Sequence, residues 1–175
     1  MSILAIDVGV KNLGLCVWDR GRVTHWWVHS LVDGKYVPAQ NVKYVWAFLE
    51  QHRSLFERAS VVLIERQMRT NMRVIEALLE FAFLGRSIVL SPRSIKMHYG
   101  LCMRDYRKNK IAAVEFIRTH LTTHPHLVEP VLVEKFHTSR KQDDLADSLL
   151  MLLYYLDTYS NALPPCPAPA VAASS

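Results

Sequence analysis

Short apolar runs recur along the first 90 residues and predict the strands of a sheet. Apolar stretches at 3–8, 13–19 and 23–29 predict three consecutive strands, the first two joined by a turn over 9–12. The sequence Asp19-Arg20-Gly21 between the second and third stretches is a hairpin signal. The continuous apolar run at 60–66 predicts a fourth strand buried on both faces, and residues 87–90 predict a short fifth strand.

Helical spacing of apolar residues predicts the elements between these strands. In the segment 39–58, apolar residues recur at this spacing at Val42, Val45, Trp46, Leu49 and Phe56. A second helix is expected from about 71 to 84, where Gly85 follows as a C-terminal cap.

The second half of the chain is expected to be mainly helical. Ser91-Pro92 opens an element with proline at the first helical position, and helices are expected at 107–121 and 141–160 around an irregular stretch at 122–139. This order of elements predicts an α/β fold, a mixed five-stranded sheet flanked by helices on both faces. We expect one domain over 1–162, followed by a disordered tail at 163–175 that is rich in proline, alanine and serine.

Composition narrows the class of protein. Half of the 175 residues are apolar and 21% are charged, as in a globular protein, and no apolar run is long enough to span a membrane. The start of the sequence has no secretory signal, so we expect an intracellular protein that is not secreted. Cys16, Cys102 and Cys166 lie far apart without C-x-x-C spacing, which indicates a reducing compartment and no structural zinc.

The net charge of +5 is distributed unevenly. Basic residues outnumber acidic ones between Arg86 and Arg118, and Arg66, Arg69 and Arg73 form a second basic cluster. Such clusters suit a polyanion whose phosphates approach the protein. The plainer alternative is a solvated basic surface on helices.

Four acids stand out by their positions. Asp7 ends the first apolar strand, Glu65 ends the fourth, and Asp144 and Asp147 lie near the start of the last helix. A carboxylate at the end of a buried strand is costly unless something pairs with it. Because Mg²⁺ prefers oxygen ligands, a divalent metal site accounts for all four acids together.

Each acid alone also has an ordinary structural explanation. Asp7 fits a turn that uses Gly9, and Glu65 can pair with a neighbouring basic residue such as Arg66. Asp143 or Asp144 fits the N-terminus of the last helix, so either residue can be the third acid of the site. On that helix Asp144 and Asp147 are about 60° apart. They lie opposite the apolar stripe expected to face the core, formed by Leu145, Leu149, Leu152 and Leu156.

Three segments carry a family resemblance. Residues 6–12 (Ile-Asp-Val-Gly-Val-Lys-Asn), 64–67 (Ile-Glu-Arg-Gln) and 141–148 (Lys-Gln-Asp-Asp-Leu-Ala-Asp-Ser) resemble the RuvC-type Holliday junction resolvases. The subgroup is that of poxviruses and other large DNA viruses, which is related to the fungal mitochondrial resolvases. The resemblance covers about residues 1–160. It implies a ribonuclease H-like fold in which the first and fourth strands are neighbours, and, for a virus-encoded protein, a place in the host cytoplasm or nucleus.

The resemblance also implies an activity and roles for residues. Such relatives are homodimers that bind branched DNA, four-way junctions in particular, and cut two opposed strands symmetrically with Mg²⁺ or Mn²⁺. Asp7, Glu65, Asp144 and Asp147 are the implied metal ligands, which suits two ions per site. Lys110 is the expected catalytic lysine, with Lys108 or Lys96 as alternatives. The residues expected to contact DNA are Lys11, Asn12, Arg66, Arg69, Arg73, Arg104, Arg107 and Lys108.

Three other functions share part of this pattern. A YqgF-type ribonuclease acting on structured RNA resembles the chain at residues 7–11 but fits 64–67 and 141–148 less well. A sugar-kinase or actin-like ATPase needs two such domains, so the chain is too short for it. An inactive nucleic-acid-binding module of the same fold predicts a missing acid, and none of the four is missing.

Overall fold

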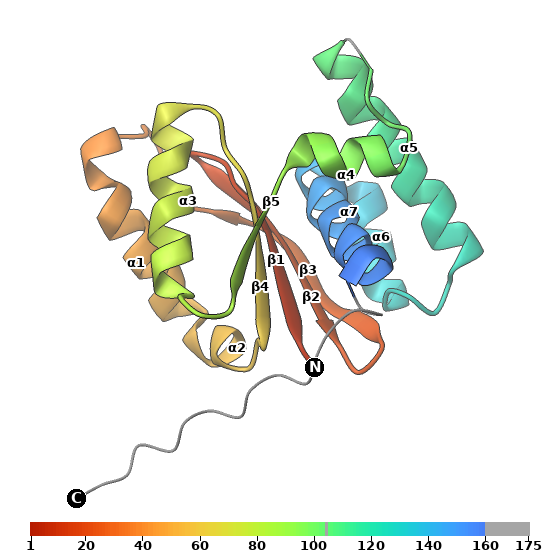
Figure 1. Cartoon of the computed structure of the whole chain (residues 1–175), viewed down its shortest axis with the longest axis horizontal. Helices are drawn as coiled ribbons and strands as arrows, with labels where there is room; N and C mark the ends of the chain where they lie inside the picture. Colours follow the sequence, from red (N-terminus) through yellow and green to blue (C-terminus); the bar gives the residue numbers. More distant parts are fainter. Residues whose placement is uncertain (104, 160–175) are drawn as a thin grey trace, which may run out of the picture.

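The computed structural model describes residues 1–103 and 105–159 and contains one mixed sheet (Figure 1). Its strands are β1 (Ile3–Asp7), β2 (Asn12–Asp19), β3 (Arg22–Ser30), β4 (Val61–Glu65) and β5 (Ser87–Leu90), in the order β3-β2-β1-β4-β5. β1 is antiparallel to β2 and parallel to β4, and β4 is parallel to β5. The five predicted strands and the predicted neighbours β1 and β4 are therefore confirmed.

The β2–β3 hairpin has the tight turn that its sequence predicts. Arg20 and Gly21 alone connect the two strands, and both have positive φ values, 50° and 87°. A two-residue turn with two left-handed residues follows the right-handed twist of the strands it joins.

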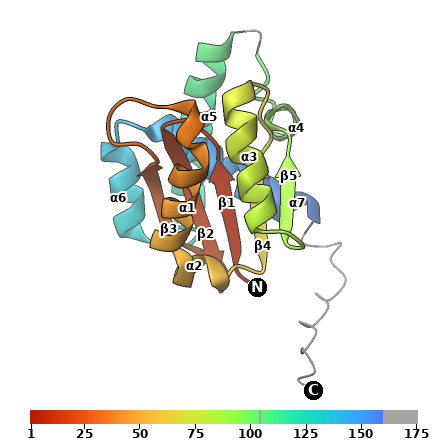
Figure 2. The same cartoon turned by 90° about the vertical axis from the view of Figure 1, so that its left-hand side faces the viewer.

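Helices cover both faces of the sheet (Figures 1 and 2). One face carries η1 (Pro38–Gln40), α1 (Asn41–Gln51), α2 (Arg53–Glu57) and α3 (Thr70–Ala82), and the other carries α4 (Pro92–His98), α5 (Tyr106–Thr123), α6 (Pro130–Thr138) and α7 (Gln142–Tyr159). Side chains alternate between the two cores, because successive strand residues point to opposite faces. In β1, Ile3 and Ala5 join the core beneath α7, whereas Leu4 and Ile6 join the core beneath α1 and α3.

Two helix predictions need correction. The helix expected over 39–58 is interrupted at His52, whose Nε2 lies 3.2 Å from His29 Nδ1 on β3. The stretch 122–139, expected to be irregular, contains the helix α6 from Pro130 to Thr138. Pro130 occupies its first turn, and Phe136 is fully buried against Trp26, with ring centroids 4.8 Å apart.

The last helix, α7, is buried more extensively than one apolar stripe implies. Leu145, Leu149 and Leu152 are buried as predicted, but Leu150 and Leu153 are buried as well. The reason is that α7 packs on β1 and β2 and is also contacted by α4, α5 and α6. Trp26 ties β3 to this helix by donating a hydrogen bond from Nε1 to the Leu145 carbonyl at 3.0 Å.

Three expectations from composition concern membrane spans, the cysteines and the C-terminal tail. Within 1–103 and 105–159, no helix combines the length and apolar character needed to cross a bilayer. Cys16 is a buried free thiol and Cys102 an exposed one. The tail predicted over 163–175 lies outside the described residues, as does Cys166.

Candidate active site

The first two acids of the site are placed side by side by the sheet. β1 and β4 are parallel neighbours with Ile6 opposite Ile64, so Asp7 and Glu65 follow at the same end of the sheet. Asp7 has the same strand parity as Ala5, and Glu65 the same parity as Leu63, which both belong to the core beneath α7. Both carboxyl groups therefore face the start of that helix.

Gly14 allows the start of α7 to approach the sheet closely. It pairs with Asp7 in the β1–β2 ladder. A Cβ atom at Gly14 would lie 2.2 Å from the backbone oxygen of Asp144 and 3.3 Å from Cβ of Asp7. Only glycine leaves room for this contact, so Gly14 sets the distance between the acids of the sheet and those of the helix.

The four predicted acids line a single pocket of about 360 Å³. Asp7, Glu65, Asp144 and Asp147 come from three separate segments of the chain. The other side chains around the pocket include Asn12, Arg66, Gln67, Arg69, Lys96 and Lys110. Asp143 does not line this pocket but faces an adjacent one, so the geometry favours Asp144 over Asp143 as the third acid.

Crowding of the carboxyl groups disfavours their ionisation. Burial raises the pKa of Asp7 well above its usual value, and the negative charges of Glu65 and Asp147 raise it further. Burial likewise raises the pKa of Glu65, of Asp147 and of Asp144. Acids that share a site repel one another when charged, so the pocket favours added protons or bound cations.

Each acid on the first turns of α7 has a lysine partner. Lys96 Nζ on α4 lies 3.2 Å from Asp147 Oδ1, with both side chains only 14% exposed. Lys141 Nζ lies 3.6 Å from Asp144 Oδ2, and Lys110 on α5 forms an ion pair with Asp143.

The lysines differ in their access to the acid pocket. Of the three candidates for the catalytic lysine, Lys110 and Lys96 line this pocket. Lys108 is exposed on the first turn of α5 and does not line it. The position of these side chains therefore leaves Lys110 and Lys96 as the candidates for the catalytic lysine.

Two residues that sequence reasoning missed hold Glu65 in place. Gln67 Nε2 donates a hydrogen bond to Glu65 Oε2 at 2.6 Å, and the Gln67 backbone N–H donates to Glu76 Oε2 at 2.6 Å. Glu76 is buried on α3 between the core residues Ile75 and Leu79. An acid among core positions of a helix was the available signal, since such a group needs a partner.

The donor chemistry of the pocket fits a hard divalent cation. All four acids supply oxygen ligands, which Mg²⁺ and Mn²⁺ accept. In the part of the chain that the structure describes, no three such side chains yet converge on one point. Lys96 pairs with one oxygen of Asp147 and Gln67 with one oxygen of Glu65, so each carboxylate keeps a second oxygen for an ion.

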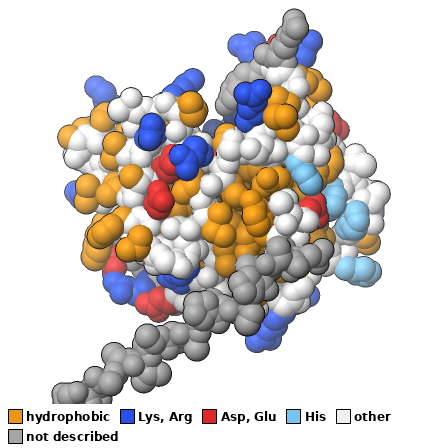
Figure 3. All heavy atoms as spheres, viewed as in Figure 1, with side chains coloured by type: hydrophobic (Ala, Val, Ile, Leu, Met, Phe, Trp, Pro, Cys, Tyr) orange, Lys and Arg blue, Asp and Glu red, His pale blue; other side chains and the backbone are white. Residues whose placement is uncertain are grey.

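The residues expected to contact DNA divide into two groups. Asn12, Arg66 and Arg69 line the acid pocket. The others lie outside it: Lys11 is exposed and donates a hydrogen bond to the Gly34 carbonyl at 3.3 Å, and Arg73, Arg107 and Lys108 are exposed. Lys and Arg side chains are visible at the upper end of the molecule, near the N-terminal ends of α3 and α5, and others lie along its lower edge (Figure 3). Arg104 lies outside the described residues.

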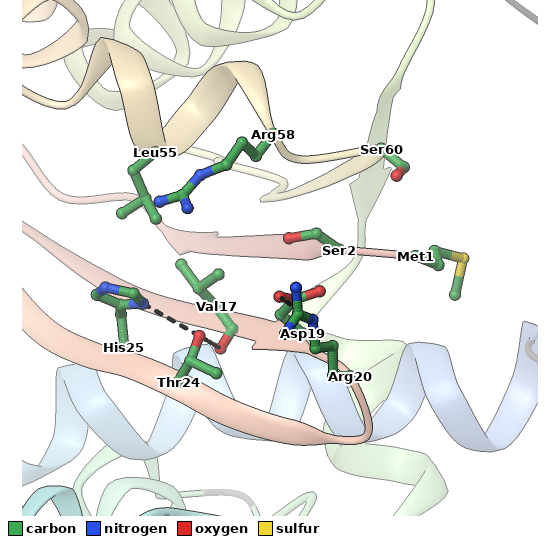
Figure 4. A pocket seen from close by; sticks show the side chains of 10 residues that line it. All are labelled: Met1, Ser2, Val17, Asp19, Arg20, Thr24, His25, Leu55, Arg58 and Ser60. Atoms are coloured by element: carbon green, nitrogen blue, oxygen red, sulfur yellow. Dashed lines mark hydrogen bonds and ion pairs between the residues drawn. The ribbon is translucent and has the colours of Figure 1, made fainter.

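Another pocket, of about 300 Å³, lies at the opposite end of the sheet (Figure 4). Met1 and Ser2 line it next to the β2–β3 turn, together with Arg58 from the end of α2. Asp19 is the single acidic residue among those that line it, and its Oδ2 lies 3.9 Å from Arg20 Nε. A metal site needs several oxygen donors, so this pocket offers no alternative to the acid pocket.

Comparisons with known proteins bear on the fold and the family of the chain. No curated protein sequence matches the chain. The fowlpox virus resolvase, in complex with its substrate Holliday junction DNA, has a TM-score of 0.65 and 16% identity, covering 90% of this chain and 97% of that chain. The yeast mitochondrial Holliday junction resolvase has a TM-score of 0.64 and 18% identity, covering 92% and 86%. Thermus thermophilus RuvC has a TM-score of 0.53 and 16% identity, covering 90% and 96%.

These structural likenesses confirm the predicted ribonuclease H-like fold. A family match covers nearly the whole described chain, since residues 1–158 match the family described as Poxvirus A22 protein. The predicted resemblance to the poxvirus subgroup of RuvC-type resolvases is thereby confirmed. The chain belongs to the poxvirus A22 protein family.

Proposed function

We propose that this protein is a metal-dependent endonuclease that resolves four-way DNA junctions by paired, symmetric incisions. The observation that carries the proposal is that Asp7, Glu65, Asp144 and Asp147 all line one pocket. Basic residues beside that pocket suit the approach of a polyanion. Solved relatives described as Holliday junction resolvases support the choice of a junction as substrate.

The residues of the pocket have distinct roles in this proposal. The four acids would hold Mg²⁺ or Mn²⁺, two ions per site. When bound there, such ions would supply activation of a water and positive charge for the phosphodiester. Lys110, on the pocket wall, places an ammonium group near the scissile phosphate. Arg66 and Arg69 contact the backbone of the strand, and such contacts position the DNA without reading its sequence.

Paired incisions require two active sites. One copy of the chain supplies one acid pocket among its described residues, so the proposal includes a homodimer. A two-fold dimer places two such pockets on a substrate that is itself roughly two-fold symmetric. Junction selectivity then arises from the spacing of the pockets.

A cleavage assay with three labelled substrates tests the proposal. Purified protein is incubated with a four-way junction, a linear duplex of the same arm sequence and a structured RNA, each with and without Mg²⁺. We expect two symmetric cuts in the junction only, and only with the metal. Preferred cleavage of the RNA would instead indicate the ribonuclease function, and binding without any cleavage would indicate an inactive module.

Substitutions assign the result to the acid pocket. Asp7→Asn, Glu65→Gln, Asp144→Asn and Asp147→Asn should each abolish cleavage and leave junction binding equal or tighter, because repulsion of phosphate falls. Asp143→Asn, on the same helix turn, tests the choice between the two acids and should keep more activity than Asp144→Asn, although it loses the ion pair with Lys110. Loss of cleavage in the Asp143 variant but not in the Asp144 variant would reverse this assignment.

Light scattering of protein, free and on the junction, should give the mass of a dimer.

A further inference from the structure

A second pocket, also of about 360 Å³, lies directly beside the acid pocket. Lys110 lines both pockets, and the consecutive residues Asp143 and Asp144 each line a different one. The second pocket lies between α5 and the start of α7, and its polar lining includes Arg118, Ser139, Arg140 and Gln142. We call it the flanking pocket.

The charges of the flanking pocket favour an anion. Its two acids already have partners, because Glu115 Oε1 accepts a hydrogen bond from Arg118 Nη1 at 2.6 Å and Asp143 pairs with Lys110. Lys110, Arg118 and Arg140 bring three positive charges against these two. The excess of positive charge is what a phosphate group complements.

Arg118 is held in a fixed orientation but keeps donor capacity. Its Nη2 donates a hydrogen bond to Gln142 Oε1 at 2.7 Å, and Gln142 Nε2 donates to the His137 carbonyl at 2.8 Å. The Nε atom of Arg118 is buried and has no hydrogen-bond partner among the described residues. The side chain as a whole is 40% exposed, so a phosphate oxygen can reach its outer donors, and it reaches Nε if the guanidinium shifts.

The start of α7 adds to this preference. Gln142 is the first residue of the 18-residue helix, so its positive dipole end lies at the pocket. Unpaired amide groups and the dipole together make the N-terminus of a helix favourable for anions.

We propose that the flanking pocket binds a DNA backbone phosphate next to the one that is cut, on the same strand. This inference rests on the proposed function, because it takes the acid pocket as the place of the scissile phosphate. Because Lys110 lines both pockets, one DNA strand can place neighbouring phosphates in the two pockets. Arg140, which is exposed, and Arg118, which is partly exposed and bound to Gln142, are positioning residues that fix the strand in register with the acids.

Removal of single phosphate charges from the substrate tests the proposal. Synthetic junctions carry one neutral methylphosphonate linkage at each position flanking the cut. With the wild-type protein, we expect one flanking position to weaken junction binding in Ca²⁺ by roughly tenfold, the loss expected for one charge-assisted hydrogen bond. Arg140→Ala should weaken binding of the unmodified junction by a similar factor. The same variant should be insensitive to the methylphosphonate at that position, as in a double-mutant cycle.

The control variant is Arg58→Ala in the pocket at the opposite end of the sheet (Figure 4). It should bind and cleave like the wild type and keep the full methylphosphonate penalty. Arg118→Met is a second test inside the flanking pocket, accompanied by thermal unfolding because Arg118 also holds Gln142. It too should remove the penalty.

The outcomes separate this inference from the proposed function. If the wild type cleaves junctions but Arg140→Ala and folded Arg118→Met keep the full penalty at every position, the flanking pocket does not bind the strand. A lack of any positional penalty in the wild type also overturns the inference while leaving the nuclease function intact. If the wild type neither binds nor cuts junctions, the proposed function fails, and the flanking-pocket inference fails with it.

Discussion

Substitution of Gly14 by alanine tests whether the backbone contact between β2 and α7 sets the geometry of the acid pocket. The added Cβ would lie 2.2 Å from the Asp144 backbone oxygen and 2.8 Å from its carbonyl carbon. Both neighbours are backbone atoms, which cannot rotate away as the end of a flexible side chain can. The first turn of α7 must therefore move away from the sheet.

The size of the effect follows from these distances. Ordinary contact begins at about 3.4 Å, so the separation must grow by roughly 1 Å. Overpacking of this kind typically costs about 1–3 kcal/mol of unfolding free energy. A misplacement of about 1 Å in an active site can reduce the rate by about 100-fold. We therefore expect a moderate loss of stability and a large loss of cleavage, with junction binding nearly unchanged.

Single-turnover cleavage of a four-way junction, together with urea unfolding, measures both quantities. Gly21→Ala is the matched control, because nothing lies within 4 Å of its added Cβ and only the positive φ is strained. It should lose some stability and no activity. If Gly14→Ala instead cleaves within threefold of the wild-type rate, the contact with Asp144 does not set the catalytic geometry.

Three further predictions concern the surroundings of the acids. Lys96→Met leaves Asp147 without its cation and should destabilise the metal-free protein by up to about 3 kcal/mol. To check this, the rise in melting temperature on adding Mg²⁺ is measured, and it should be larger in the variant than in the wild type. Glu76→Met leaves the buried Gln67 N–H without an acceptor and should cost about 1–3 kcal/mol in urea unfolding and slow cleavage. Burial and neighbouring charges raise the pKa of Asp7, so the folded metal-free protein binds more protons at this residue than the unfolded chain. Its free energy of unfolding therefore falls as pH rises above the usual aspartate range. Asp7→Asn should therefore gain melting temperature over the wild type as pH rises from about 4, the usual aspartate pKa, to about 8, and a constant difference over that whole range would contradict the pKa shift.

Local sequence signals were sufficient for the sheet but not for every helix. The strands were predictable because each apolar run is short and is bounded by turn residues, such as Arg20-Gly21 with its two positive φ values. The helix α6 was missed because it is short and its stability depends on a distant partner. Phe136 is buried by stacking on Trp26, which is more than 100 residues away in the sequence. At the break, His52 contacts His29 of another element, a neighbour that the local sequence does not show.

The acids of the site were predictable for a physical reason that does not extend to their supports. Asp7 and Glu65 end apolar strands, where an unpaired charge is conspicuous in any sequence. The residues that position these acids can be recognised only in the folded structure. In the sequence, Gly14 is one glycine within a strand and Lys96 is one of many basic residues. The choice between Asp143 and Asp144 also required the fold, because adjacent helix residues face pockets that only tertiary packing defines.

The charge balance of the acid pocket explains why the fold tolerates such crowding. Burial raises the pKa of Asp7, Glu65, Asp144 and Asp147, so their ionisation at neutral pH reduces the stability of the metal-free protein. Lys96 relieves part of this repulsion at Asp147. The relief is incomplete, because the pKa of Asp147 remains raised. A cation that binds only the folded state adds the missing charge and stabilises that state by mass action. Metal affinity, and the stabilisation that the metal adds, should therefore rise with pH, whereas the stability of the metal-free protein falls.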